Sequence, residues 1–239
     1  MEDLRVLEDK SFFEARDYLK GKYGDEVFSV ADQFPLFSGT HCIARHIYQY
    51  ELIKETLPLS GDIFEFGAWH GSTTIFISKM LRLLSPQSPK KVYVFDNFEG
   101  LPVSSDEDGV LAKEFVGQYC GNLARLQDII TANGFENLIQ LQIGDARQTI
   151  PQFCDENSHK LVSLAYIDFD LYEPTKLALD FVGERLVLGG MIALDEGMSE
   201  TWKGESQALS EFLADYPGMF EVLSNPLTRQ PEIILRKIG

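Results

Sequence analysis

The sequence predicts an α/β fold in which a seven-stranded, mostly parallel sheet carries helices on both faces and ends in an antiparallel hairpin. Two observations predict this fold. Short apolar runs alternate with amphipathic segments of helical period, which is typical of a parallel sheet covered on both faces. The last two apolar runs are separated only by NPLTRQP, which is too short for a parallel crossover and therefore indicates a hairpin.

Length and composition fit one globular unit of this kind. The chain has 239 residues, of which 44% are hydrophobic and 24% are charged. Its formal net charge of −16 would repel phosphates, so neither a nucleic acid nor a membrane is expected as a partner. The apolar runs are too short to span a bilayer, and the first residues lack the apolar core of a secretory signal. Cys42, Cys120 and Cys154 form no CxxC pair, so we expect a cytoplasmic protein with reduced thiols.

Residues 1–60 are expected to form an N-terminal helical cap or lid. A short helix is predicted around Ser11–Leu19. A longer helix is predicted from Thr40 to Leu57, because apolar residues recur at helical spacing at Ile43, Ile47, Tyr50 and Leu57. Residues 61–239 are expected to form the sheet domain.

Strands and helices alternate through this second part. Five strands are predicted before the hairpin, over Asp62–Phe66, Lys91–Phe95, Ile139–Ile143, Leu161–Ile167 and Met191–Leu194. Helices are predicted over Ser72–Leu84, Asn122–Ala132, Pro174–Glu184 and Ser206–Ala214. The hairpin strands are predicted over Phe220–Leu223 and Glu232–Ile238. This order is typical of the Rossmann-like sheet of class I methyltransferases rather than of a dinucleotide-binding fold.

The turn after the first strand, FGAWHGSTT, is the first candidate binding element. In open α/β sheets, ligands bind where a strand ends and the chain turns into a helix. Gly67 and Gly71 would let the backbone approach a ligand, and Ser72 and Thr73 begin a helix whose first N–H groups are free. The G-x-x-x-G spacing does not match the dinucleotide fingerprint. Without other signals, the two glycines could equally form an ordinary strand-to-helix turn.

Acidic residues near the ends of three consecutive strands narrow the choice of ligand. Asp96 is placed to accept hydrogen bonds from two ribose hydroxyls. Asp145 follows the third strand and could face the amino group of an adenine, and Glu65 adds negative charge that suits an amino or sulfonium cation. Together they indicate S-adenosylmethionine (AdoMet), although each acid by itself could equally be a solvated loop carboxylate.

Several segments then resemble one known family. They are GDIFEFGAWHGST, VFDNFEGLP, YIDFDLYEPTKLAL, and RLVLGGMIALDEG followed by GESQALSEF. The chain from about Leu59 to Phe212 is similar to the macrocin O-methyltransferase family, class I enzymes that depend on AdoMet and a metal and methylate sugar hydroxyls on macrolides and aminocoumarins. The resemblance implies that residues 61–239 are the methyltransferase domain and that the acceptor is a glycosylated small molecule.

The resemblance also implies where the ligands bind. It implies that Glu65, Gly67 and Asp96 belong to the AdoMet-binding site. It also implies that acidic residues after the fourth and fifth strands hold a divalent ion. With the flanking residues of the same turns, the expected AdoMet site consists of Glu65, Gly67, Ala68, Trp69, Gly71, Ser72, Thr73, Asp96, Asn97, Phe98, Asp145, Ala146 and Asp168.

Three acids at neighbouring strand ends predict the same metal site from the residues themselves. Asp168 ends the fourth strand, and Asp195 and Glu196 end the fifth, so they should converge at one edge of the sheet. Such oxygen ligands suit Mg²⁺ or another divalent cation. The family usually has a second aspartate where this chain has Glu196. We expect Asp195 also to be the catalytic base, and Asp170 to alternate to the other side of the strand in a structural role.

The sequence is also compatible with two other functions. In YEPTK, Tyr172 and Lys176 match the Tyr-x-x-x-Lys pair of NAD(P)-dependent short-chain dehydrogenases. A methyltransferase-like fold could also serve as a non-catalytic binding protein. The sequence leaves the oligomeric state undecided, with a homo-oligomer as one candidate.

The variable segments are expected to select the acceptor. They are residues 1–60, the 97–120 loop and the segment around Trp202. The loops Asn97–Gly109 and Ser199–Gly204 are expected to close over bound ligands, because long polar loops in compact domains often form lids. His41 and His46 have no partner visible in the sequence and are expected to be surface or packing residues.

Overall fold

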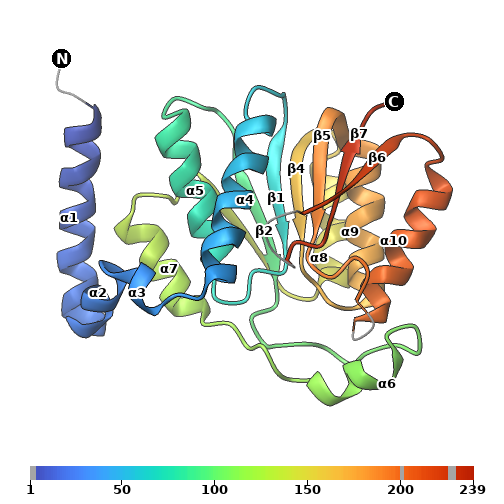
Figure 1. Ribbon diagram of the computed structural model, residues 1–239, viewed down its shortest axis with the longest axis horizontal. Helices are drawn as coiled ribbons and strands as arrows, with labels where there is room; N and C mark the ends of the chain where they lie inside the picture. Colours follow the sequence, from blue (N-terminus) through green and yellow to red (C-terminus); the bar gives the residue numbers. More distant parts are fainter. Residues whose placement is uncertain (1–3, 200–201, 226–229) are drawn as a thin grey trace.

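The computed structural model describes the backbone of residues 4–199, 202–225 and 230–239. Seven strands form one sheet in the order β3-β2-β1-β4-β5-β7-β6 (Figure 1). Strands β1 to β5 are parallel, and β7 lies antiparallel between β5 and β6. The predicted fold class, a mostly parallel sheet that ends in an antiparallel hairpin, is confirmed.

Most strands lie within a residue or so of their predicted limits. They are β1 (Asp62–Phe66), β2 (Val92–Asp96), β3 (Ile139–Ile143), β4 (Val162–Ile167), β5 (Leu186–Leu194), β6 (Phe220–Ser224) and β7 (Ile233–Lys237). The largest difference is in β5, which begins well before the predicted Met191. Its first half crosses Gly189, whose φ is 78°, and this glycine interrupts the apolar pattern on which the prediction relied.

The helices include all those that the pattern predicted. They are α1 (Leu4–Tyr23), α2 (Glu26–Ala31), α3 (Phe34–Phe37), α4 (Thr40–Thr56), α5 (Ser72–Leu84), α6 (Gly109–Ala112), the 3₁₀ turn η1 (Lys113–Phe115), α7 (Leu123–Ala132), α8 (Ala146–Glu156), α9 (Tyr172–Arg185) and α10 (Lys203–Asp215). None of the described helices is long and apolar enough to cross a membrane.

Helix α8 lies where the sequence pattern predicted no helix. Pro151 stands inside it, and an internal proline normally interrupts helical hydrogen bonding. Two features outweigh this cost. The Asp145 side chain caps the helix by accepting a hydrogen bond from the backbone N–H of Arg147. Ile150 and Phe153 are buried in the core, so packing on the sheet stabilises the helix.

Two apolar cores lie on opposite faces of the sheet. Along β1, Ile63 belongs to the core shared with α4, α5 and α7, whereas Phe64 and Phe66 belong to the core shared with α8, α9 and α10. This follows from the period of two along a strand, and Figure 1 shows helices on both faces. The strand order reverses between β1 and β4, so the carboxyl ends of these strands are where an open α/β sheet binds its ligand.

The N-terminal segment divides between the edge of the molecule and its core. Helix α1 packs against α7 at one end of the molecule (Figure 1). Helix α4 packs on α5, β4 and β5, and its residues Leu52 and Ile53 are buried in the core. Because α4 is part of the layer that covers the sheet, it can carry side chains to the strand ends. A distinct cap over residues 1–60 stays a prediction.

Candidate active site

The glycine turn after β1 packs against the end of β4. Gly67 has a φ of 89°, in the left-handed region that favours glycine. A Cβ atom at Gly67 would lie 1.9 Å from the carbonyl oxygen of Asp168, so any side chain there would displace the end of β4. Gly71, with a φ of 81°, precedes the first turn of α5. The glycine spacing is therefore required by the turn as well as suited to a ligand.

Asp96 ties the end of β2 to this turn. Its Oδ2 accepts hydrogen bonds from the backbone N–H groups of Ala68 (2.6 Å) and Trp69 (2.8 Å), and its Oδ1 accepts one from Phe98 (2.6 Å). An ionised carboxylate has about four acceptor positions. Asp96 can therefore hold the turn and still accept a hydrogen bond from a ribose hydroxyl.

Asp145 accepts hydrogen bonds from the helix that follows it, α8. Besides capping α8, it accepts a hydrogen bond from Nε of Arg147 at 2.9 Å. Hydrogen bonding from the Arg147 side chain lowers the pKa of Asp145 below its ordinary value. The carboxylate is therefore ionised and oriented, and its contact with an adenine amino group stays a prediction.

Glu65 is a buried carboxyl at the end of β1. Its side chain is 1% exposed, and its Oε2 accepts a hydrogen bond from the Thr74 hydroxyl at 2.5 Å. Desolvation raises the pKa of Glu65 to about 8. A cation bound beside it would favour the ionised form, so this carboxyl fits the sulfonium or amino group of AdoMet.

These elements open onto one cavity of about 770 Å³ at the carboxyl ends of the strands. This volume is within the range of small-molecule sites. All the predicted AdoMet residues line the cavity except Gly71 and Phe98. The Gly71 backbone lies against Leu126, and the Phe98 side chain is buried in the core beside α5 and α7. The contact of these two residues with AdoMet stays a prediction.

Two acids after β4 and β5 converge on a cation that the protein itself supplies. Nη2 of Arg45 lies 2.8 Å from Oδ1 of Asp195 and 3.2 Å from Oδ2 of Asp168. The same nitrogen lies 3.2 Å from the hydroxyl oxygen of Tyr166, which donates a hydrogen bond to Oδ1 of Asp195 at 2.8 Å. Arg45 is not among the residues that the sequence predicts for the site, because an arginine in a helix outside any motif gives no signal of its position at a strand end.

Glu196, the third predicted metal ligand, lines the cavity but is held by other partners. Its Oε1 accepts a hydrogen bond from the side-chain amide of Gln230, and its backbone N–H donates to Oε1 of Glu205 at 2.9 Å. Glu205 is completely buried at the start of α10, and burial raises its pKa well above the ordinary value. Within the part of the chain that the structure describes, no three His, Cys, Asp or Glu side chains form a ready metal-binding group.

Strand alternation predicted that Asp170 would point away from the site, and this prediction is wrong. Strand β4 ends at Ile167, and Asp170 has a φ of 62°, so the period of two does not extend to it. Its side chain lines the same cavity as Asp168. Desolvation, followed by the charges of Asp195 and Glu196, raises the pKa of Asp170 to about 7. The cavity thus holds several carboxylates, whose donor chemistry fits a bound cation.

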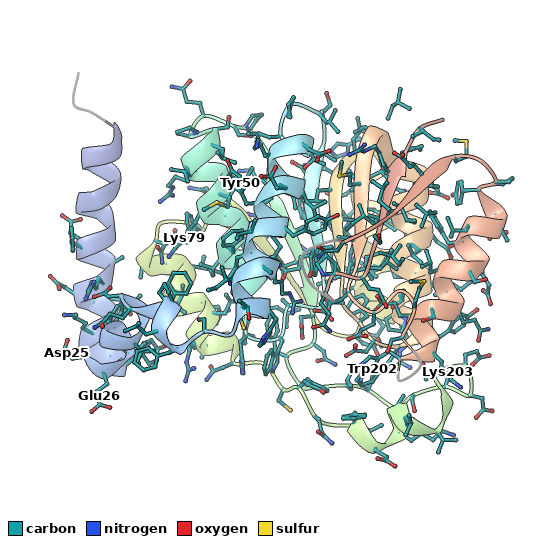
Figure 2. All side chains as sticks on the ribbon, in the orientation of Figure 1. Asp25, Glu26, Tyr50, Lys79, Trp202 and Lys203 are labelled. Atoms are coloured by element: carbon teal, nitrogen blue, oxygen red, sulfur yellow. The ribbon has the colours of Figure 1, made fainter. Side chains whose placement is uncertain are left out.

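Aromatic side chains from three separate segments also line the cavity. Trp69 comes from the glycine turn, Tyr119 from the 97–120 loop and Trp202 from the start of α10. The ring centroids of Trp69 and Tyr119 are 6.2 Å apart, and those of Tyr119 and Trp202 are 6.4 Å apart. Figure 2 shows Trp202 beside the segment that carries α6. His41 and His46 line the cavity as well. His41 is exposed and the His46 ring stacks on Phe76, in line with the expectation that they are surface or packing residues.

The structure does not support the dehydrogenase alternative. The Tyr172 hydroxyl donates a hydrogen bond to Oε2 of Glu211 at 2.8 Å, and Nζ of Lys176 lies 3.1 Å from the same oxygen. Neither residue lines the cavity. The Tyr-x-x-x-Lys pair therefore ties α9 to α10 instead of facing a substrate.

Known proteins are similar to this chain in sequence and in fold. The family model described as macrocin O-methyltransferase (TylF) matches residues 46–219. A relative from Streptomyces olivaceus, 8-demethyl-8-(2,3-dimethoxy-alpha-L-rhamnosyl)-tetracenomycin-C 4'-O-methyltransferase, is 29% identical over 175 residues, which cover 70% of this chain. The match spans 62% of that relative's length, less than two thirds.

Solved structures give the same fold. The crystal structure of CalS11, a calicheamicin methyltransferase, is similar over 99% of this chain and 97% of that chain, with a TM-score of 0.79 and 26% identity. The O-methyltransferase NovP is similar over 82% of this chain and 81% of that chain, with a TM-score of 0.69. The sequence identity between NovP and this chain is 17%, so the similarity supports only the fold.

Proposed function

The chain belongs to the macrocin O-methyltransferase family, and from this premise we propose that it transfers the methyl group of AdoMet to a sugar hydroxyl on a natural product. The observation that carries the proposal is the single cavity that combines the predicted AdoMet residues with the acids after β4 and β5. The name of the Streptomyces olivaceus relative, which specifies a rhamnosyl group, supports a sugar as the acceptor. AdoMet supplies the methyl group when it is bound.

The residues around the glycine turn would bind and orient the cofactor. Asp96 offers a carboxylate to the ribose, and Asp145 offers one to the adenine. Glu65, buried behind the turn, would place negative charge near the sulfonium. Ser72 and Thr73 begin α5, whose first N–H groups favour an anion such as the carboxylate of the cofactor.

The acceptor would occupy the part of the cavity lined by Trp69, Tyr119 and Trp202. The faces of aromatic rings pack well against the C–H groups of a sugar ring, and the same rings exclude water from the reacting atoms. These three residues come from the glycine turn and from two of the segments that were predicted to select the acceptor. We expect the 97–120 loop to close over the bound ligands. The predicted second lid, Ser199–Gly204, includes residues 200 and 201, which lie outside the described residues.

We propose in addition that the cavity binds a divalent cation. Asp168, Asp195 and Glu196 would hold it, and all three line the cavity. Two of these carboxylates already share a cation in the structure, because they both contact Arg45, and oxygen donors of this kind suit Mg²⁺. Such an ion would make the acceptor hydroxyl more acidic.

The geometry favours Asp170 over the predicted Asp195 as the group that accepts the proton from the acceptor. Oδ1 of Asp195 already accepts hydrogen bonds from Arg45 and Tyr166, which orient it as a ligand. Asp170 lines the same cavity, and no side chain in the described part of the protein donates a hydrogen bond to its carboxylate. Its acceptor positions would therefore be open to the hydroxyl of an acceptor in the cavity.

The test is methyl transfer from labelled AdoMet to a panel of glycosylated and unglycosylated acceptors. It is run with EDTA, with EDTA and excess Mg²⁺, and with the variants Asp195→Asn and Asp170→Asn. We expect transfer to glycosylated acceptors only, loss of activity in EDTA and recovery with Mg²⁺. Asp170→Asn should lose at least about a hundredfold in kcat, as expected for removal of a general base.

Different results would remove different parts of the proposal. Full activity in EDTA would end the metal requirement while leaving methyl transfer intact. An Asp170→Asn enzyme with normal turnover would exclude Asp170 as the base. If no glycosylated acceptor is methylated although S-adenosylhomocysteine (SAH) binds, the acceptor class is wrong.

A further inference from the structure

Three oxygen atoms surround one nitrogen of Arg45. Nη2 contacts Oδ1 of Asp195, Oδ2 of Asp168 and the hydroxyl of Tyr166, at 2.8, 3.2 and 3.2 Å. The two carboxylates come from neighbouring strand ends, whereas Arg45 comes from α4, far away in the sequence. A single positively charged group thus occupies the point where the acids of the two strands meet.

This is an unusual way for an arginine to bind carboxylates. A guanidinium group normally presents two parallel N–H groups to one carboxylate. Here one nitrogen makes all three contacts, and Nε of Arg45 is buried without a hydrogen-bond partner among the described residues. Arg45 therefore acts as a point charge inside an oxygen cage, and an unpartnered buried N–H group makes its position costly to maintain.

We propose that Arg45 is a resident cation that holds the place of the divalent ion and exchanges with it. This proposal rests on the divalent ion in the proposed function. Mg²⁺ binds oxygen ligands at about 2.0–2.1 Å, so an ion held by Oδ1 of Asp195 and Oδ2 of Asp168 would stand in the space that Nη2 of Arg45 now occupies. Repulsion between the two positive charges also opposes simultaneous binding.

The structure gives Arg45 a way to leave. The side chain of Arg45 is 29% exposed, and the residue lines the cavity. Its long, flexible stem can rotate into the cavity while α4 stays packed on the sheet through Leu52 and Ile53. Before the exchange, Arg45 keeps the carboxylates of Asp168 and Asp195 from repelling each other. After it, the ion takes over that role.

The experiment measures Mn²⁺ binding directly, by electron paramagnetic resonance of free Mn²⁺, in the full chain without acceptor. Wild type is compared with Arg45→Gln and with the matched control Arg147→Gln. Arg147 also lines the cavity, but it pairs with Asp145 and Glu173 rather than with the predicted metal ligands. We expect Arg45→Gln to bind Mn²⁺ roughly tenfold more tightly than wild type, a typical coupling between two competing ligands, and Arg147→Gln to bind within about twofold of wild type.

Thermal unfolding gives a second measurement and shows whether the variants fold. Without metal, Arg45→Gln should unfold at a lower temperature than wild type, because two carboxylates lose their cation. Added Mn²⁺ should raise its midpoint by more than that of wild type. Equal or weaker Mn²⁺ binding by Arg45→Gln, or no binding by either protein, would overturn the exchange. Activity in EDTA tests the metal requirement separately, so the failure of one proposal can be told from the failure of the other.

Discussion

The carboxylate of Asp96 accepts a hydrogen bond from the backbone N–H of Ala68 at 2.6 Å, and this bond joins the end of β2 to the turn after β1. The same oxygen accepts a second bond from Trp69. A residue predicted only as a ribose ligand therefore also shapes the turn after β1. We therefore expect cofactor binding and local stability to be coupled at Asp96.

We expect Asp96→Ala to weaken SAH binding at least about tenfold, because hydrogen bonds that involve a charged group contribute about 1.5–3 kcal/mol each. Isothermal titration calorimetry measures the affinity. The matched control is Asp62→Ala. Asp62 binds the backbone N–H of Lys91 and the side chain of Lys160 at the opposite end of β1, so its loss should lower stability without changing SAH affinity. Equal SAH affinity for Asp96→Ala and wild type would refute the ribose assignment.

Gly67→Ala should abolish folding or cost more than about 4 kcal/mol in unfolding free energy, because steric overlap with buried backbone is among the most damaging changes. The added Cβ would overlap the carbonyl oxygen of Asp168, and φ is 89°. Gly218→Ala is the control, since Gly218 has a φ of 73° but no heavy atom lies within 4 Å of the point where a Cβ would stand. It should cost only about 1–2 kcal/mol, the strain of a left-handed residue. Denaturant unfolding of both variants checks this, and similar losses would contradict the close packing of the turn.

Glu65 should make stability depend on pH in a defined direction. Its pKa rises from about 4.3 when unfolded to about 8 in the folded protein. Between these values the folded protein binds more protons than the unfolded chain, so the unfolding free energy falls as the pH rises. The contribution of Glu65 to stability is fully present below its unfolded pKa and is completely lost above its folded pKa. Glu65→Gln should show a shallower fall over this range in denaturant titrations, and identical slopes would contradict the raised pKa.

Glu65 should also link AdoMet binding to pH. A sulfonium near the carboxyl would lower its pKa, so binding should release a proton and become tighter as the pH rises toward about 8. SAH carries the same amino group but no sulfonium, so the ratio of the two affinities isolates this effect. In wild type we expect that ratio to change with pH, and in Glu65→Gln we expect it to stay constant. A constant ratio in wild type would place the sulfonium away from Glu65.

The loop Asn97–Gly109 and the following segment should become ordered when ligands bind. Leu101 and Tyr119 already line the cavity, and the Phe115 ring lies 5.0 Å from the Trp202 ring. Hydrogen exchange with and without SAH should show protection between residues 100 and 119. The turn at residues 134–138, which does not line the cavity, serves as the internal control. Unchanged exchange in the 100–119 segment would rule out a lid there.

The sequence by itself determined the fold class, and most of the residues that it predicted for AdoMet line one cavity. Periods of two and of 3.6 residues depend on local chain geometry, so β1, β3 and α5 lie where the pattern predicted. Residues that directly follow a parallel strand must meet at one sheet edge, so Asp96, Asp145 and Asp168 could be assigned to one cavity before any contact was known.

Only the tertiary structure decided which groups face the acids. Asp170 lies past the end of β4 in a left-handed conformation, where strand alternation no longer predicts direction. Glu205 and Gln230 reach Glu196 from other elements, and α8 forms despite Pro151 because packing stabilises it. Arg45 reaches the strand ends from α4 through the packing of that helix on the sheet. Contacts between residues distant in the chain depend on how whole elements pack, and one sequence without its fold carries no local signal of them.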